Sequence, residues 1–116
     1  MKLENELGSV AVSNRVIASV AGSAATACFG VKGMTEDSVR DGIVRLLKRE
    51  QMTKGVVVTP TQDGSAVDLE LHIAVDPGVN AAAAADSIIA EVRYNVERQT
   101  GLRTGQITVC IDAVKA

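Results

Sequence analysis

Residues 66–76 read Ala-Val-Asp-Leu-Glu-Leu-His-Ile-Ala-Val-Asp, and this stretch decides the fold. Every second residue from Val67 to Val75 is apolar, whereas the residues between them include Asp68, Glu70 and His72. Side chains alternate between the two faces of a β-strand, so the pattern predicts a strand with one dry face and one wetter face. The apolar face must be buried against other elements, which the rest of the chain must supply.

Further strands are expected around this one. A β-branched run at residues 56–59 is separated from it by Asp63-Gly64, and such a dipeptide between two runs indicates a hairpin. Short strands are also expected at residues 8–12 and 106–114. In the last of these, Ile107, Val109, Ile111 and Ala113 share one face, and Thr108, Cys110 and Asp112 share the other.

Two helices are expected before the hairpin. Ser13 is a suitable N-cap for a helix that begins at Asn14 and ends at Gly30, a residue type common just beyond helix ends. Residues 35–50 form the second candidate, with Thr35 as the cap, acidic residues in the first turn and basic residues in the last. That charge order suits the helix dipole.

The longest helix is expected at residues 81–100, between an Asn80 cap and a Gly101 stop. The predicted order is strand, helix, helix, strand, strand, helix, strand. At least two helices must then cover one face of a mainly antiparallel sheet. The fold class predicted is α+β, a two-layer sandwich with two or three helices on one face of the sheet.

Length and composition narrow the functional classes. The chain has 116 residues and 47% hydrophobic residues, which predicts one domain over residues 8–116 after a polar lead-in at residues 1–7. A net charge of −2 does not favour binding to the negatively charged backbone of nucleic acid. The chain has no Trp, one Phe and one Tyr, so it lacks the aromatic side chains on which bases stack. Two cysteines and no apolar leader predict a cytoplasmic protein without direct membrane insertion.

One cluster of polar residues has chemical potential. Asp68, Glu70, His72 and Asp76 share the wetter face of the central strand, where a His between carboxylates suits a proton shuttle or a metal site. Cys110 would approach His72 if the two strands are neighbours, as in a Cys–His pair. The simpler interpretation is a solvated or partner-facing sheet surface. We therefore assign no catalytic residue, no metal ligand and no cofactor from the sequence.

The sequence Gly30-Val31-Lys32-Gly33 has the G-x-x-G form and lies between two predicted helices. KH modules clamp nucleic-acid backbone with such a loop, so Gly30, Lys32 and Gly33 are candidate contacts of an RNA-binding alternative. The acidic chain and the single Lys in the loop argue against nucleic acid. The competing interpretation is a helix end followed by a turn or a short strand.

An ordered set of stretches carries a resemblance to a known family. The set is residues 8–13, 16–21, 30–34, 54–58, 67–80, 96–102 and 107–114. Together they resemble the alkaline-shock/general-stress protein family of Gram-positive bacteria over essentially the whole chain from Gly8. The resemblance implies a small non-enzymatic protein tied to cell-envelope stress, in some cases held at the membrane by a related anchored partner and in some linked to fatty-acid metabolism.

Together these observations favour a protein-interaction or scaffold module. The expected partner is a second copy or a related, membrane-anchored family member, which would place the protein at the membrane periphery. The candidate interaction surface is His72, Ala74, Thr108, Cys110 and Asp112. A KH-like RNA binder and a regulator linked to lipid metabolism are the two alternatives.

Overall fold

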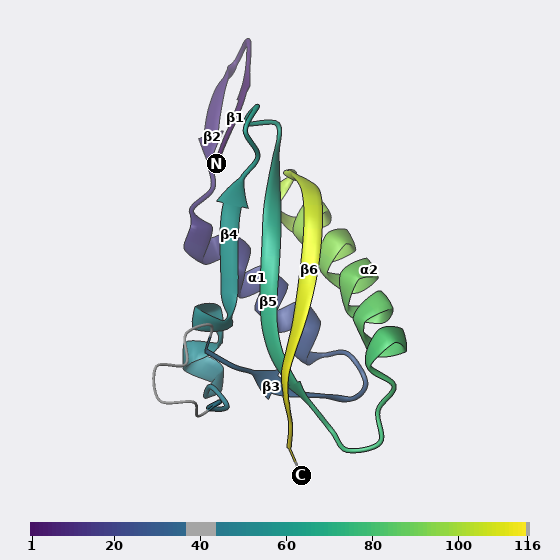
Figure 1. Cartoon of the computed structure of the whole chain (residues 1–116). Coiled ribbons are helices and arrows are strands. Elements are labelled where there is room, and N and C mark those ends of the chain that lie inside the picture. Colours follow the sequence, from purple (N-terminus) through teal and green to yellow (C-terminus); the bar gives the residue numbers. More distant parts are fainter. Residues whose placement is uncertain (37–43, 116) are drawn as a thin grey trace.

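The computed structural model describes residues 1–36 and 44–115. Its elements form one elongated body with a hairpin projecting from one end (Figure 1). In chain order they are β1 (Lys2–Asn5), β2 (Gly8–Ala11), α1 (Asn14–Thr26), β3 (Val31–Met34), η1 (Arg49–Gly55), β4 (Val56–Pro60), β5 (Ala66–Val75), α2 (Ala81–Thr100) and β6 (Arg103–Val114).

The strand predicted first, β5, is the centre of the main sheet. β6 runs parallel to it along one edge, from the pair Ala66 and Arg103 to the pair Val75 and Val114. The other edge is shared: β4 pairs antiparallel with residues 67–71 of β5, and β3 pairs antiparallel with residues 73–75. The β4–β5 hairpin is confirmed. The parallel β5–β6 pair follows from the helical connection between them, because parallel strands need a crossover.

Helices α1 and α2 lie together on one face of this sheet, behind it in Figure 1. The core between the two layers is aliphatic, with Ile17, Leu71, Ile73, Ile88 and Val92 all 0% exposed. The alternate residues of β5 that were predicted to face the core are therefore buried. The predicted α+β class, a mainly antiparallel sheet with helices on one face, is confirmed.

The helix ends follow their caps. The Ser13 hydroxyl accepts from the Val16 N–H at 3.2 Å, and the Asn80 side chain accepts from the Ala83 N–H at 3.0 Å. Gly101 adopts φ 76°, the left-handed conformation that glycine favours, and ends α2 as predicted. α1 is shorter than predicted, since it ends at Thr26 rather than at Gly30.

The helix predicted at residues 35–50 is wrong for the residues that the structure describes. Thr35 continues from β3 along the central strand: its N–H donates to the His72 carbonyl at 2.9 Å, and it forms an isolated bridge with Leu46. A 3-10 segment, η1, then leads into β4. The capping pattern at Thr35 is a local preference, and pairing with β5 overrides it. The part of the predicted helix at residues 37–43 lies outside the described residues.

The first residues also differ from the expected lead-in. Lys2–Asn5 and Gly8–Ala11 pair as an antiparallel hairpin, β1–β2, whose strands are exposed throughout. The apolar residues of this hairpin are unusually accessible, with Leu7 98% and Val10 58% exposed. The hairpin therefore extends away from the core rather than adding to it.

Candidate functional site on the outer sheet face

The sheet face opposite α1 and α2, here called the outer face, brings together residues that are far apart in the sequence. In the parallel β5–β6 pair, Glu70 lies opposite Thr108 and His72 lies opposite Cys110. Residues paired across neighbouring strands project to the same face of a sheet. The approach of Cys110 to His72, conditional in the sequence analysis, is therefore realised.

His72 is held by carboxylates on both sides of its ring. Its Nδ1 lies 2.9 Å from Asp112 Oδ2, and its Nε2 lies 2.9 Å from Glu70 Oε2. The Thr35 hydroxyl donates to the same Asp112 oxygen at 2.9 Å. Only 7% of His72 is exposed, so the ring is fixed in orientation. A neutral imidazole has one N–H, so both contacts are hydrogen bonds only when the ring carries two protons.

Cys110 completes a compact group of possible ligands. A carboxylate oxygen of Glu70, a ring nitrogen of His72 and the Cys110 sulfur all lie within 4.8 Å of one another. The Glu70 side chain is 44% exposed and Cys110 is half-buried, so the group is reachable from solvent while His72 is not. This arrangement combines a rigid imidazole with an accessible carboxylate and a thiol.

The structure modifies the predicted interaction surface. Ala74 is 0% exposed, so neither Ala74 nor His72 offers its side chain to a partner. Leu46 packs beside them, since it lies 3.2 Å from the position of a Cβ on Gly33, the residue paired with Ala74. Thr108 is exposed, and Cys110 and Asp112 are half-buried. The accessible part of the surface is therefore the end near Thr108.

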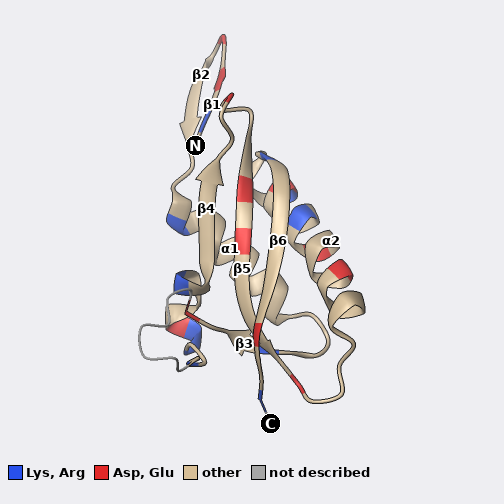
Figure 2. Ribbon diagram, viewed as in Figure 1, with Lys and Arg blue, Asp and Glu red and all other residues tan. Residues whose placement is uncertain are grey.

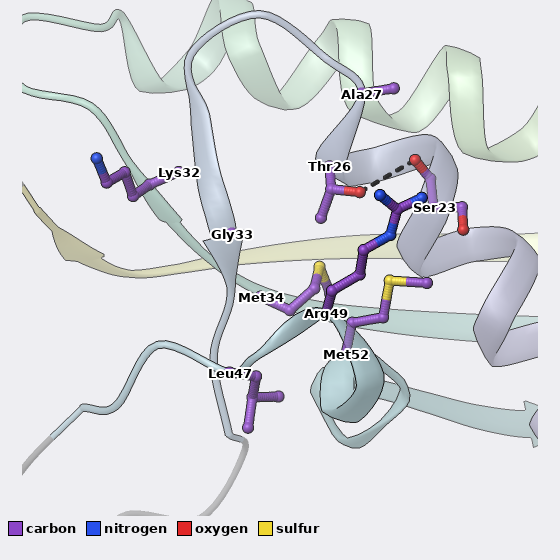
Figure 3. Close-up of a pocket in the computed structure, with 9 residues that line it drawn as sticks. All are labelled: Ser23, Thr26, Ala27, Lys32, Gly33, Met34, Leu47, Arg49 and Met52. Atoms are coloured by element: carbon purple, nitrogen blue, oxygen red, sulfur yellow. Dashed lines mark hydrogen bonds between the residues drawn. The ribbon is translucent and has the colours of Figure 1, made fainter.

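The G-x-x-G loop lies on a different part of the molecule. Gly30 ends a turn after α1, and Lys32 and Gly33 belong to β3, so the loop does not join two helices as the KH alternative expects. The competing interpretation, a turn followed by a short strand, is correct. Lys32 and Gly33 border a pocket of about 440 Å³ between α1 and η1, and Figure 3 shows the Lys32 side chain directed away from it. Arg49 crosses this pocket toward Ser23.

The sequence predicts association through the candidate surface or through an unpaired strand edge, but it does not locate such an edge; the structure identifies one on β6. Within residues 1–36 and 44–115, no strand pairs with β6 on the side away from β5. Side chains of α2 cover its beginning, since the Arg93 guanidinium donates to the carbonyls of Thr104 and Gly105 at 3.2 Å. Glu97 accepts from the Thr104 N–H and hydroxyl at 2.9 and 2.8 Å, and these bonds lower the pKa of that carboxyl.

The second cysteine provides a contrast. Cys28 lies just after α1, half-buried against the core, and its thiol donates to the Ala24 carbonyl at 3.4 Å. Burial, and then the nearby Glu91 carboxylate, raise the pKa of this thiol. The two cysteines therefore occupy separate surroundings, one beside the core and one beside His72.

The fold and the site define a small α+β module whose outer face carries one buried histidine. The chain belongs to the alkaline shock protein 23 family, described as having a cell envelope-related function, because the family model matches residues 2–116. This confirms the resemblance that the sequence carries. Of the described helices, none combines the length and apolar character that crossing a membrane requires.

Two relatives match along nearly their full length. "Uncharacterized protein YloU" of Bacillus subtilis (strain 168) is 30% identical over 116 residues, which cover 99% of this chain and 95% of the relative. "Uncharacterized protein Spy1614" of Streptococcus pyogenes serotype M6 is 34% identical, with 99% and 94% covered. No solved structure matches the chain.

Proposed function

We propose that this chain is a non-enzymatic interaction module of the cell envelope that associates, through the outer edge of β6, with a second copy of itself or with a related family member. The observation that carries the proposal is the long outer edge of β6, with which no strand in the described part of the chain pairs. An unpaired edge presents backbone N–H and C=O groups that readily pair with another strand. The family description supports the envelope setting.

The side chains of β6 strengthen this interpretation. β6 is 12 residues long, and residues 104–111 contain no charged residue, as the uninterrupted tan ribbon in Figure 2 shows. Edge strands that stay single are usually shortened or carry Lys or Pro. Arg103 and Asp112 flank the uncharged stretch and do not interrupt it. The stretch is long enough to pair with a strand of ordinary length.

The opposite edge strand of the sheet provides a comparison within the same molecule. β4 has only five residues and ends in Pro60, which lacks an N–H. A short strand with a terminal proline is a poor template for strand addition. The two edges therefore differ as expected if β6, and not β4, receives a partner.

Light scattering across a concentration series tests the proposal. We expect the wild type to associate, and Thr108→Arg to shift the protein to monomer, because charges on both copies would meet at the new strand pair. Thr59→Arg is the matched control: it places the same side chain at an exposed threonine of β4 and should leave association unchanged. A wild type that stays monomeric at high micromolar concentration, together with an empty pulldown from native cells at moderate salt, would refute the proposal.

The proposed association through β6 also predicts where the protein is located in the cell. A partner that is itself anchored would hold this chain at the cytoplasmic side of the membrane, as a peripheral protein. Membrane fractions should then contain the wild type, and Thr108→Arg should release it. Recovery of both proteins in the membrane fraction would show that attachment does not use this edge.

A second candidate function rests on a hollow beside α2. This pocket has a volume of about 450 Å³. Its lining includes the apolar residues Phe29, Pro77, Val79 and Ala84, and Phe29 is 94% exposed. Apolar hollows of this size suit small ligands. Native mass spectrometry of the protein purified from its own cells tests this lipid-linked alternative: an acyl compound retained by the wild type and lost in Val79→Asp would support it.

A further inference from the structure

The outer face holds a set of donor atoms that neither the family description nor the interaction proposal uses. Glu70, His72 and Cys110 offer oxygen, nitrogen and sulfur atoms within 4.8 Å of one another. Carboxylate, imidazole and thiolate are the donors that bind Zn²⁺ in proteins. Mere proximity of charged groups would not indicate a metal, so the orientation of each donor matters.

The distances suit a small ion after a minor adjustment. With metal–ligand distances of about 2.0–2.3 Å, neighbouring ligands of a tetrahedral zinc site lie about 3.3–3.8 Å apart. Glu70 Oε2 and His72 Nε2 are closer than that, at 2.9 Å, and the upper limit for the set is 4.8 Å. Binding would therefore require new side-chain torsions at Glu70, whose side chain is 44% exposed, and at Cys110.

The surroundings of His72 match those of a metal-bound imidazole. His72 Nδ1 lies 2.9 Å from Asp112 Oδ2 and Nε2 is directed toward Glu70, so the tautomer with its proton on Nδ1 donates to Asp112 and leaves the Nε2 lone pair for a metal. Metal-binding histidines usually donate their other ring N–H to a carboxylate in this way. The Thr35 hydroxyl fixes Asp112 in turn, and Thr35 is 0% exposed. Thr35 is therefore buried and Asp112 half-buried behind the imidazole, whereas the Glu70 side chain is 44% exposed.

We propose that Glu70, His72 and Cys110 bind one Zn²⁺ ion, with Asp112 as the orienting partner of His72. The ion takes the Nε2 lone pair, the Cys110 thiolate and one Glu70 oxygen. On binding, the thiol proton and any proton on Nε2 pass to solvent. Three protein ligands leave the fourth position of a tetrahedral ion for water or an added ligand, and the half-buried setting of Cys110 gives that position access to solvent.

Cobalt provides a direct probe, because a thiolate bound to Co²⁺ gives a near-ultraviolet charge-transfer band. Reduced, chelator-treated protein should develop this band with one equivalent of Co²⁺ and lose it on addition of Zn²⁺. Cys110→Ser should abolish the band, and Cys28→Ser is the matched control that should keep it. Asp112→Asn should retain the band while weakening Zn²⁺ binding about 10–100-fold, as expected for an orienting partner.

Two further variants keep the test independent of folding. Glu70→Gln alters a partly exposed side chain and should weaken Zn²⁺ binding, measured by calorimetry, at least tenfold while circular dichroism stays unchanged. His72→Gln should also lose binding, although its burial makes a stability check necessary. A folded wild type without the band, a band that follows Cys28, or a Cys110→Ser variant that still binds cobalt through sulfur would overturn the proposal.

Discussion

Asp112 contacts His72 because β6 carries one extra residue at this point. Ile73 pairs with Ile111, but the next residue of β5, Ala74, pairs with Ala113, so Asp112 has no residue of β5 opposite it. An extra residue in a strand pair redirects its side chain and is often found beside functional sites. Here Asp112 Oδ2 reaches His72 Nδ1 at 2.9 Å and also accepts from the Thr35 hydroxyl.

The first prediction tests this contact. Asp112→Ala should lower the free energy of unfolding by about 1–3 kcal/mol, because the buried Thr35 hydroxyl and His72 Nδ1 lose a shared acceptor. Asp86→Ala, at an exposed position of α2, should change stability by less than about 0.5 kcal/mol. Urea unfolding measures both variants. Equal effects would show that the carboxylate of Asp112 contributes little to the fold.

A pair of glycine substitutions should have opposite effects. A Cβ on Gly55 would lie 2.7 Å from the Thr35 carbonyl oxygen and 3.2 Å from that of His72, so Gly55→Ala must displace backbone. We expect a loss of about 1–3 kcal/mol. A Cβ on Gly22 in α1 would meet Met52 at 3.5 Å, an ordinary contact. Gly22→Ala should then stabilise by about 0.5–1 kcal/mol, since Ala favours helix over Gly. Thermal unfolding of the two variants distinguishes the signs.

The Glu97 carboxylate predicts an acid-sensitive contribution to stability. Bonds from the Thr104 N–H and hydroxyl lower its pKa in the folded protein from the ordinary 4.5. A group with a lowered folded pKa stabilises above its unfolded pKa and loses that effect as pH falls through the folded value. The stability of the wild type should therefore decline below about pH 4.5, and Glu97→Gln should be less stable at neutral pH with a weaker decline. Glu6→Gln, at an exposed turn, is the control.

The comparison of sequence with structure separates local from non-local signals. The alternation in β5 and the caps Asn80 and Gly101 of α2 were predicted because each depends on neighbours in the chain. Within the predicted helix at residues 35–50, the described residues were misassigned because the N–H of Thr35 pairs with His72, a residue that local propensity does not consider. The position of Asp112 depends on a one-residue irregularity between strands, and no composition or periodicity indicates it. The pairing of His72 with Cys110 became definite only with the β5–β6 register.

The RNA alternative makes its own prediction. Lys32 is exposed and belongs to the strand β3, not to a loop that joins two helices directly. Lys32→Asp should therefore leave RNA retention in native cells unchanged, and neither protein should bind RNA with the steep salt dependence of phosphate contacts. Crosslinking to RNA that disappears in this variant, while Lys2→Asp behaves like the wild type, would favour the RNA-binding alternative.

The register of the proposed β6 pairing can be tested by disulfide formation. In an antiparallel pair related by a two-fold axis, a residue at the axis lies opposite its own copy, with the Cα atoms about 4.5–5.5 Å apart. This separation lies within the range for a disulfide. A cysteine two positions away is shifted by about four residues from its copy, about 14 Å along the strands, and cannot bond.

Because the uncharged stretch is residues 104–111, the axis should lie near Thr108. In a background of Cys28→Ser and Cys110→Ser, Thr108→Cys should form a covalent dimer on mild oxidation, whereas Gln106→Cys should not. Thr59→Cys on β4 is the control for random collisions. Equal crosslinking at all three positions would indicate non-specific contact, and a dimer formed only through Thr59→Cys would move the interface to the other edge of the sheet.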